Sequence, residues 1–175
     1  MSNFKSIEEA REFFKNDKFA TDMGIQIDEL TEESCQCSLE LTDGHKNAVG
    51  GVMGGVMFTL ADFSFAVLSN QLHSPTVSQQ VSVIYLSAPK GEKLIANAFC
   101  KKNGRSSSII NVDVVDDTGR DVVQFIGTGF KLWISHLVYV NLLVGNLIFC
   151  FSCEKILILS NFRKFFRKIY KLPPF

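Results

Sequence analysis

Residues 55–68 read Gly-Val-Met-Phe-Thr-Leu-Ala-Asp-Phe-Ser-Phe-Ala-Val-Leu. This stretch is too long for an ordinary strand, and wound as a helix it is apolar on nearly all sides. The pattern therefore predicts a long helix that is buried over most of its surface. Such a helix needs other elements to cover it, and the flanking sequence supplies candidates.

Strand patterns stand on both sides of this helix. Before it, two short stretches alternate apolar and polar side chains around a polar turn at Thr31–Ser34, the first at residues 25–27 and the second at residues 35–41. After it come four longer candidates, and Asn103-Gly104 between two of them is a strong hairpin signal. These four are Thr76–Ser87, Lys93–Lys102, Ser106–Asp116 and Asp121–Leu132.

A short helix is predicted near the N-terminus. Ser6-Ile7-Glu8-Glu9 has the pattern of a capping box, and the apolar side chains of Ala10, Phe13 and Phe14 follow it. The helix is expected to end before Met23-Gly24. The elements thus run as a short helix, two strands, a long helix and four strands. One long central helix wrapped by an antiparallel sheet of about six strands is an α+β arrangement, which we expect over residues 1–132 as one domain.

Composition divides the chain at about the same place. All 175 residues together carry no net charge and are 46% apolar, so neither disorder of the whole chain nor a nucleic-acid partner is expected. Residues 1–132 carry 12 Lys and Arg against 17 Asp and Glu, a net charge of −5. Residues 133–175 carry 6 Lys and Arg against one Glu, a net charge of +5. Opposite signs indicate two regions under different constraints.

The cysteines indicate a reducing compartment. There are five, at positions whose spacing fits neither a disulfide framework nor a zinc site. The N-terminus has no apolar segment of the secretory kind. We therefore expect a cytoplasmic protein with reduced thiols, no metal and no cofactor.

One charged residue is out of place. Between Lys46 and Lys90, Asp62 is the only formally charged side chain, and it falls in the middle of the apolar helix. A buried carboxylate costs several kcal/mol unless it is paired or protonated, so it either has a structural partner or does chemistry. Both interpretations are open on these residues alone.

Glycines at the start of the helix favour chemistry. Gly54-Gly55 stands where the helix begins, and glycine lets a ligand approach the backbone closely. The first amides of a helix are unpaired donors at the positive end of its dipole, and they can hold a carbonyl oxygen that is gaining negative charge. The alternative is a tight turn with close packing.

A longer stretch makes the pattern specific. Residues 47–62, Asn-Ala-Val-Gly-Gly-Val-Met-Gly-Gly-Val-Met-Phe-Thr-Leu-Ala-Asp, resemble the signature of hotdog-fold acyl-CoA thioesterases of the phenylacetate-degradation, or PaaI-like, type. Later segments fit the same family, namely Leu86-Ser87-Ala88-Pro89-Lys90-Gly91, Asn103-Gly104-Arg105-Ser106, Val114-Val115-Asp116-Asp117-Thr118-Gly119 and Gly127-Thr128-Gly129-Phe130. The resemblance covers roughly residues 5–132 and implies a hotdog fold.

The resemblance also implies roles for single residues. It makes Asp62 the catalytic carboxylate and Gly55 the amide donor, with Asn47 as a further catalytic residue. It implies substrate contacts at a second set of residues, Met53, Gly54, Lys90, Arg105 and Ser106. Met53 departs from the family, because many members have His there, so it bears on rate and substrate preference. An ordinary hairpin turn is the other interpretation of Arg105.

The expected activity is hydrolysis of acyl-CoA thioesters to free acid and CoA. Asp62 would either activate water or attack the thioester carbonyl itself. No GxSxG nucleophile elbow and no P-loop occurs in the chain. His45, in the loop before Asn47, could line the mouth of the site, but an exposed loop histidine is the favoured interpretation. The alternative function is a non-catalytic hotdog module that binds and senses acyl-CoA.

The spacing of Gly55 and Asp62 predicts a site shared between subunits. They are seven residues apart on one helix face, a rise of roughly 10 Å, whereas a reacting carboxylate must come within about 3 Å of its target or act through one water. An antiparallel, two-fold-related helix would bring its own carboxylate opposite Gly55. We therefore expect a homodimer, or a tetramer made of two such dimers.

Residues 133–175 form a hydrophobic and basic tail. Trp133–Phe151 has no formal charge and approaches the length of a membrane span, and basic residues follow it. Three interpretations are open: a non-native extension read out of frame, a membrane anchor, and an amphipathic helix that binds a partner. Any membrane contact is expected through this tail alone.

The composition break makes a prediction. A protein ending at Leu132 should fold and keep full activity, because no predicted strand or helix of the domain is removed. Circular dichroism, thermal melting and thioester hydrolysis, each compared with the full chain, test this. Loss of folding or solubility in the shortened protein alone would make the tail part of the domain.

Overall fold

The computed structural model describes residues 3–132, 149–150 and 157–158. The chain divides into two compact units, Met1–Leu132 and Trp133–Phe175. In the second unit, β7 (Phe149–Cys150) pairs with β8 (Leu157–Ile158). The interpretations of the tail fall outside the described residues. Within the described part of the chain, no helix is long and apolar enough to cross a membrane.

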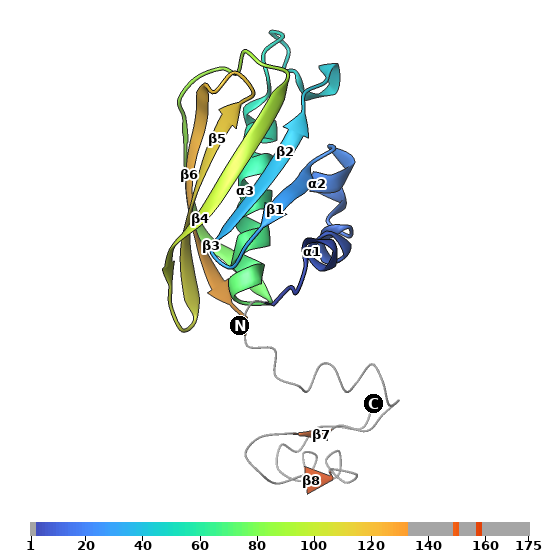
Figure 1. Ribbon diagram of the computed structural model, residues 1–175, viewed down its shortest axis with the longest axis vertical. Coiled ribbons are helices and arrows are strands. Elements are labelled where there is room, and N and C mark those ends of the chain that lie inside the picture. The colour runs from blue at the N-terminus through green and yellow to red at the C-terminus, as the bar shows by residue number, and fades with distance from the viewer. Residues whose placement is uncertain (1–2, 133–148, 151–156, 159–175) are drawn as a thin grey trace, which may run out of the picture. The chain divides into compact units, whose positions relative to one another are not determined.

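The first unit is a single antiparallel sheet around one long helix (Figure 1). The sheet order is β1-β2-β4-β5-β6-β3, so β1 and β3 are its edges. This confirms the predicted α+β hotdog arrangement. The strands are β1 (Gln26–Leu30), β2 (Ser34–Glu40), β3 (Thr76–Tyr85), β4 (Lys93–Asn103), β5 (Ser107–Asp116) and β6 (Asp121–Lys131).

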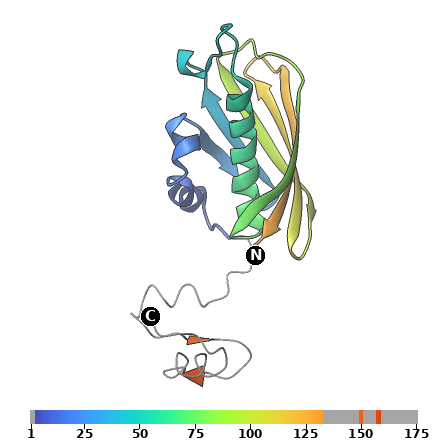
Figure 2. The same ribbon diagram turned by 180° about the vertical axis from the view of Figure 1, so that it is seen from behind.

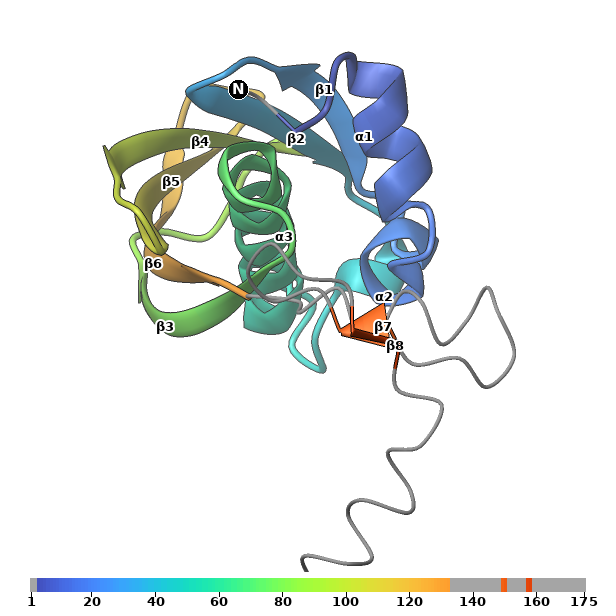
Figure 3. The same cartoon turned by 90° about the horizontal axis from the view of Figure 1, so that it is seen from below.

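Helix α3 (Gly54–Leu72) lies in the concave face of the sheet, as Figures 2 and 3 show from behind and from below. Leu60, Phe65 and Leu68 of the helix are fully buried against the sheet. Burying one such side chain contributes about 1.5–3 kcal/mol, so this contact is the main source of stability. The contact is close. A Cβ on Gly127 of β6 would lie 2.7 Å from the Phe65 ring, so only glycine fits there.

Two short helices lie beside β1. Helix α1 (Ile7–Phe14) begins at Ser6, whose side chain accepts from the Glu9 amide at 3.3 Å as predicted. The Glu9 carboxylate, however, accepts from the Lys5 amide, so the second half of the capping box departs from the expected pattern. The prediction of one helix up to Met23-Gly24 is wrong, because α1 ends at Phe14 and a separate helix, α2 (Lys18–Asp22), begins after its N-cap residue Asp17. Five residues are too few to show a period of their own.

Asp116 joins two loops at one end of the sheet. Its side chain is buried, and its carboxylate accepts from the amides of Lys90 (2.8 Å), Thr118 (3.0 Å) and Arg120 (3.0 Å), and from the Thr118 hydroxyl (2.5 Å). The hydrogen bond from the Thr118 hydroxyl and those from the backbone lower the pKa of Asp116 well below its ordinary value. The ionised Asp116 carboxylate therefore fixes the loop that carries Lys90 by accepting hydrogen bonds from its backbone.

This network predicts a pH-dependent contribution to stability. Because the pKa of Asp116 is lowered by folding, its stabilisation is fully present above the unfolded pKa of about 3.9 and is lost as pH falls further. Asp116→Asn should lower the melting temperature by a similar amount from neutral pH down to about pH 5, with the difference shrinking below about pH 4. Thermal melts across pH, with the exposed Asp121→Asn as control, measure this. A difference that grows on acidification would contradict it.

Candidate functional site

The loop before α3 is held by its own backbone and by Asn47. The Asn47 carboxamide oxygen accepts from the amides of Val49 and Gly51, both at 3.1 Å. The backbone amide of Asn47 also donates to the Gly51 carbonyl at 2.7 Å. Gly50 has φ +83°, a conformation that favours glycine. Asn47 therefore organises the loop in this chain, and its predicted catalytic role stays a prediction.

The start of α3 presents uncapped amides. Met53 is the N-cap residue, and its side chain makes no capping hydrogen bond. The same side chain lies over Gly55, since a Cβ there would be 3.5 Å from Met53 Cε. Tyr85 of β3 donates its hydroxyl to the Gly54 carbonyl at 3.1 Å, which fixes the first turn from the other side. The first amides of α3 are thus rigidly placed donors at the positive end of the helix.

Asp62 lies two turns further along α3 and is half-buried. Burial raises its pKa above the ordinary value, the negative charge of Asp17 raises it further, and a hydrogen bond with Ser78 opposes both. The carboxylate is therefore a stronger base than a free aspartate, and the Ser78 hydroxyl on β3 limits the rise in its pKa. Such a group suits proton abstraction.

A cavity of about 650 Å³ brings Met53, Gly55 and Asp62 together beside α2. Its volume is in the range of small-molecule sites. Most of the other lining side chains are apolar, including Phe19, Ala20, Met23, Val56, Phe58, Phe63 and Ala66. The site therefore combines a carboxylate, helix amides and an apolar space, as the activation of an acyl compound requires.

His45 also lines this cavity, and its environment corrects a sequence-based interpretation. The sequence favoured an exposed loop histidine, whereas the residue is only 8% exposed. Its Nδ1 accepts from the Thr42 amide at 3.1 Å, and its Nε2 donates to the Met23 carbonyl at 3.1 Å. The proton is assigned to Nε2 from these partners. His45 thus joins the end of α2 to the loop before α3.

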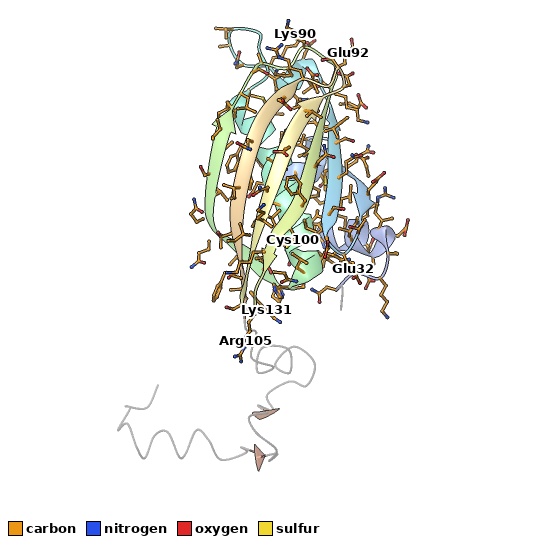
Figure 4. The ribbon with its side chains drawn as sticks, turned by 60° about the vertical axis from the view of Figure 1, so that its left-hand side comes forward. Glu32, Lys90, Glu92, Cys100, Arg105 and Lys131 are labelled. Carbon is orange, nitrogen blue, oxygen red and sulfur yellow. The ribbon has the colours of Figure 1, made fainter. Side chains whose placement is uncertain are left out.

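The remaining predicted residues lie apart from this cavity. Figure 4 shows Lys90 at one end of the sheet and Arg105 at the other. Arg105 and Ser106 lie in the β4–β5 hairpin, where the Ser106 carbonyl accepts from the Lys131 amide at 2.8 Å. One chain therefore does not bring Lys90 and Arg105 together, and their contacts with CoA stay predictions.

Two residues of the site escaped the sequence-based reasoning. Ser78 sits in a polar run, Ser78-Gln79-Gln80, that interrupts the apolar pattern of β3, and this interruption was a usable signal. Asp17 caps α2, and nothing in the sequence indicates that it faces Asp62. Among the described residues, no group of three or more His, Cys, Asp and Glu side chains is placed to hold a metal ion.

The setting of Asp62 makes a prediction about its titration. Its pKa should lie above that of a free aspartate, and Ser78→Ala should raise it further by removing the hydrogen bond that stabilises the carboxylate. Carboxyl ¹³C NMR across pH measures both values. Ser82→Ala, an exposed serine on the same strand, is the matched control. An unchanged or lower pKa in Ser78→Ala would contradict the assignment.

Several known proteins are similar to this chain in fold and in sequence. Acyl-coenzyme A thioesterase PaaI from Escherichia coli is 24% identical over 129 residues, 73% of this chain and 92% of the relative. Its structure superposes with a TM-score of 0.67 at 23% identity, over 71% of this chain and 91% of that chain. Human acyl-coenzyme A thioesterase 13 is 30% identical over 92 residues, 50% of this chain and 66% of the relative.

A further structure was solved with a ligand. The hypothetical thioesterase protein from Streptococcus pneumoniae, solved with coenzyme A, superposes with a TM-score of 0.63 at 24% identity, over 68% of this chain and 96% of that chain. Residues 49–123 match the thioesterase superfamily, and these residues include Met53, Gly55 and Asp62. Residues 49–123 therefore carry the match to the thioesterase superfamily, and the chain, with its hotdog fold, is a distant homologue of the PaaI acyl-CoA thioesterases.

Proposed function

We propose that this protein hydrolyses acyl-CoA thioesters to the free acid and CoA. The observation that carries the proposal is the half-buried Asp62, with a raised pKa, in the same apolar cavity as the uncapped start of α3. The homologous acyl-CoA thioesterases support the substrate class. The structure solved with coenzyme A supports it further.

The proposed mechanism uses the helix amide and the carboxylate in turn. The thioester carbonyl accepts from the Gly55 amide, which polarises it. The carboxylate of Asp62 takes a proton from water while the oxygen attacks the carbonyl carbon. The resulting oxyanion is stabilised by the start of α3, and its collapse breaks the C–S bond. The CoA thiolate takes up the proton. Direct attack by Asp62, followed by hydrolysis of the anhydride, gives the same products.

The proposed site is completed by a second subunit. In one chain, the rise between Gly55 and Asp62 along α3 is roughly 10 Å, too far for both to act on one carbonyl. An antiparallel copy of α3 would bring the partner subunit's Asp62 to this Gly55, and would repeat the site by symmetry. Within one subunit, Lys90 and Arg105 lie at opposite ends of the sheet. Each CoA would therefore contact Lys90 of one subunit and the partner's Arg105.

The exposed edge of the sheet supports this dimer. β3 is an edge strand of ten residues with no charged side chain, and Val77, Ile84 and Tyr85 are each about half exposed. A long edge strand with exposed apolar side chains and no charges is a template for pairing with another strand. The other edge, β1, is partly covered by α1, whose Arg11 donates to the Ile27 carbonyl at 2.6 Å. Pairing of β3 with β3 of a second copy places the two α3 helices side by side.

Complementation tests the shared site. Asp62→Asn keeps the shape of the side chain and removes its charge, and we expect it to lower thiol release from hexanoyl-CoA by roughly 100-fold or more. Gly55→Val should do the same by blocking the amide. Heterodimers made by subunit exchange between the two variants should regain one intact site, or about half of the wild-type activity per dimer.

The outcomes separate the alternatives. An active monomer, or heterodimers that stay inactive, would rule out the shared site. Binding of acyl-CoA without release of thiol by the wild type would instead support a sensing module. Asp121→Asn, which removes an exposed charge at the start of β6, is the control for both variants.

A further inference from the structure

The cavity beside α3 is lined by two kinds of side chain. Eight apolar residues, the seven named above and Met53, make most of its wall. Its ionisable carboxylates are Asp17 and Asp62, and no Lys or Arg is among the residues that line it. The cavity therefore offers an apolar ligand good contacts. Beyond the amides at the start of α3, which the thioester carbonyl would occupy, and the His45 ring, whose two nitrogens are already hydrogen-bonded, it offers a negative charge no partner.

Asp17 is fixed in place by its role in α2. It is the N-cap residue of that helix, and its carboxylate accepts from the Ala20 amide at 3.4 Å. A capping side chain has few rotamers open to it, so its charge stays at one position. That position is close enough to Asp62 for the Asp17 charge to act on it. Asp22, at the other end of α2, instead lines a neighbouring cavity with Arg11 and Lys18.

A third negative charge in this space would be repelled. Like charges a few ångströms apart in a partly dry site interact much more strongly than they do in water. A carboxylate that enters also loses hydration, and a nearby cation would be needed to offset that loss. An alkyl or aryl group has neither cost and gains from burial against the apolar wall.

We propose that Asp17 is a specificity-determining residue, which makes the cavity accept uncharged acyl groups and reject acyl groups that end in a carboxylate. This inference rests on the proposed function, because it places the acyl group in the cavity of Asp62. It also requires the phosphates of CoA to lie outside the cavity, where Lys90 and Arg105 are found.

A matched pair of thioesters tests the inference. Hexanoyl-CoA and adipyl-CoA have acyl chains of the same length, and only the second ends in a carboxylate. The quantity to compare is the ratio of their kcat/KM values in wild type and in Asp17→Asn, a substitution that retains an N-cap residue. We expect Asp17→Asn to shift this ratio toward adipyl-CoA by roughly three- to tenfold.

Two controls separate charge from structure. Asp22→Asn removes the same charge from the other end of α2 and should leave the wild-type ratio unchanged. The wild-type preference for hexanoyl-CoA should also weaken in about 1 M salt, where charges are screened within roughly 3 Å. A purely structural role of Asp17 would change both substrates alike and would not respond to salt.

The results that overturn the inference are distinct from those that overturn the function. If wild type hydrolyses hexanoyl-CoA and Asp17→Asn keeps the wild-type ratio within about twofold, the inference is wrong and the function stands. If wild type hydrolyses neither thioester, the proposed function fails. In that case the ratio of the two dissociation constants, measured by calorimetry on the same variants, decides the inference by the same criterion.

Discussion

A helix that is apolar on nearly every side must be covered on nearly every side, and most of this domain is the cover that α3 requires. The sheet encloses the helix so closely that Gly127 of β6 has no room for a side chain beside Phe65. One strip of α3 is left half-buried, and Asp62 lies on it. Because the packing demand is satisfied everywhere else, this strip is where a carboxylate can sit without being fully desolvated.

The carboxylate is placed between two opposing effects. Full exposure would leave it an ordinary weak base, and full burial would keep it protonated at neutral pH. Its position on the open strip, with a hydroxyl from β3 on one side and a second acid across the cavity, holds it between these limits. The fold thus sets the basicity of the group as well as its position.

Much of this architecture could be predicted because it is periodic. The strands follow from alternation, the long helix from its continuous apolar run, and the hairpin from Asn103-Gly104, and all of these are confirmed. Asp62 stood out as a lone charge within that run. These signals are local, so one sequence is enough to reveal them.

What could not be predicted depends on contacts across the fold. Helix α2 is too short to show a period, and without it the cavity has no second wall. His45 was interpreted as exposed because its two hydrogen-bond partners, the Thr42 amide and the Met23 carbonyl, meet only after folding. The separation of Lys90 from Arg105 is of another kind, because the two residues flank β4, and the length of that strand alone places them at opposite ends of the sheet.

His45 also links parts of the molecule that a ligand would touch separately. Its ring holds the end of α2 through the Met23 carbonyl, and its own carbonyl accepts from the Met53 amide at 2.9 Å, directly before the helix start. The wall of the acyl cavity and the amides of α3 therefore share a single anchor. In the proposed site, a bulky acyl group that pushed α2 outward would strain the same residue that positions the first amides of α3, so the size of the acyl group and the alignment of its carbonyl would be mechanically coupled.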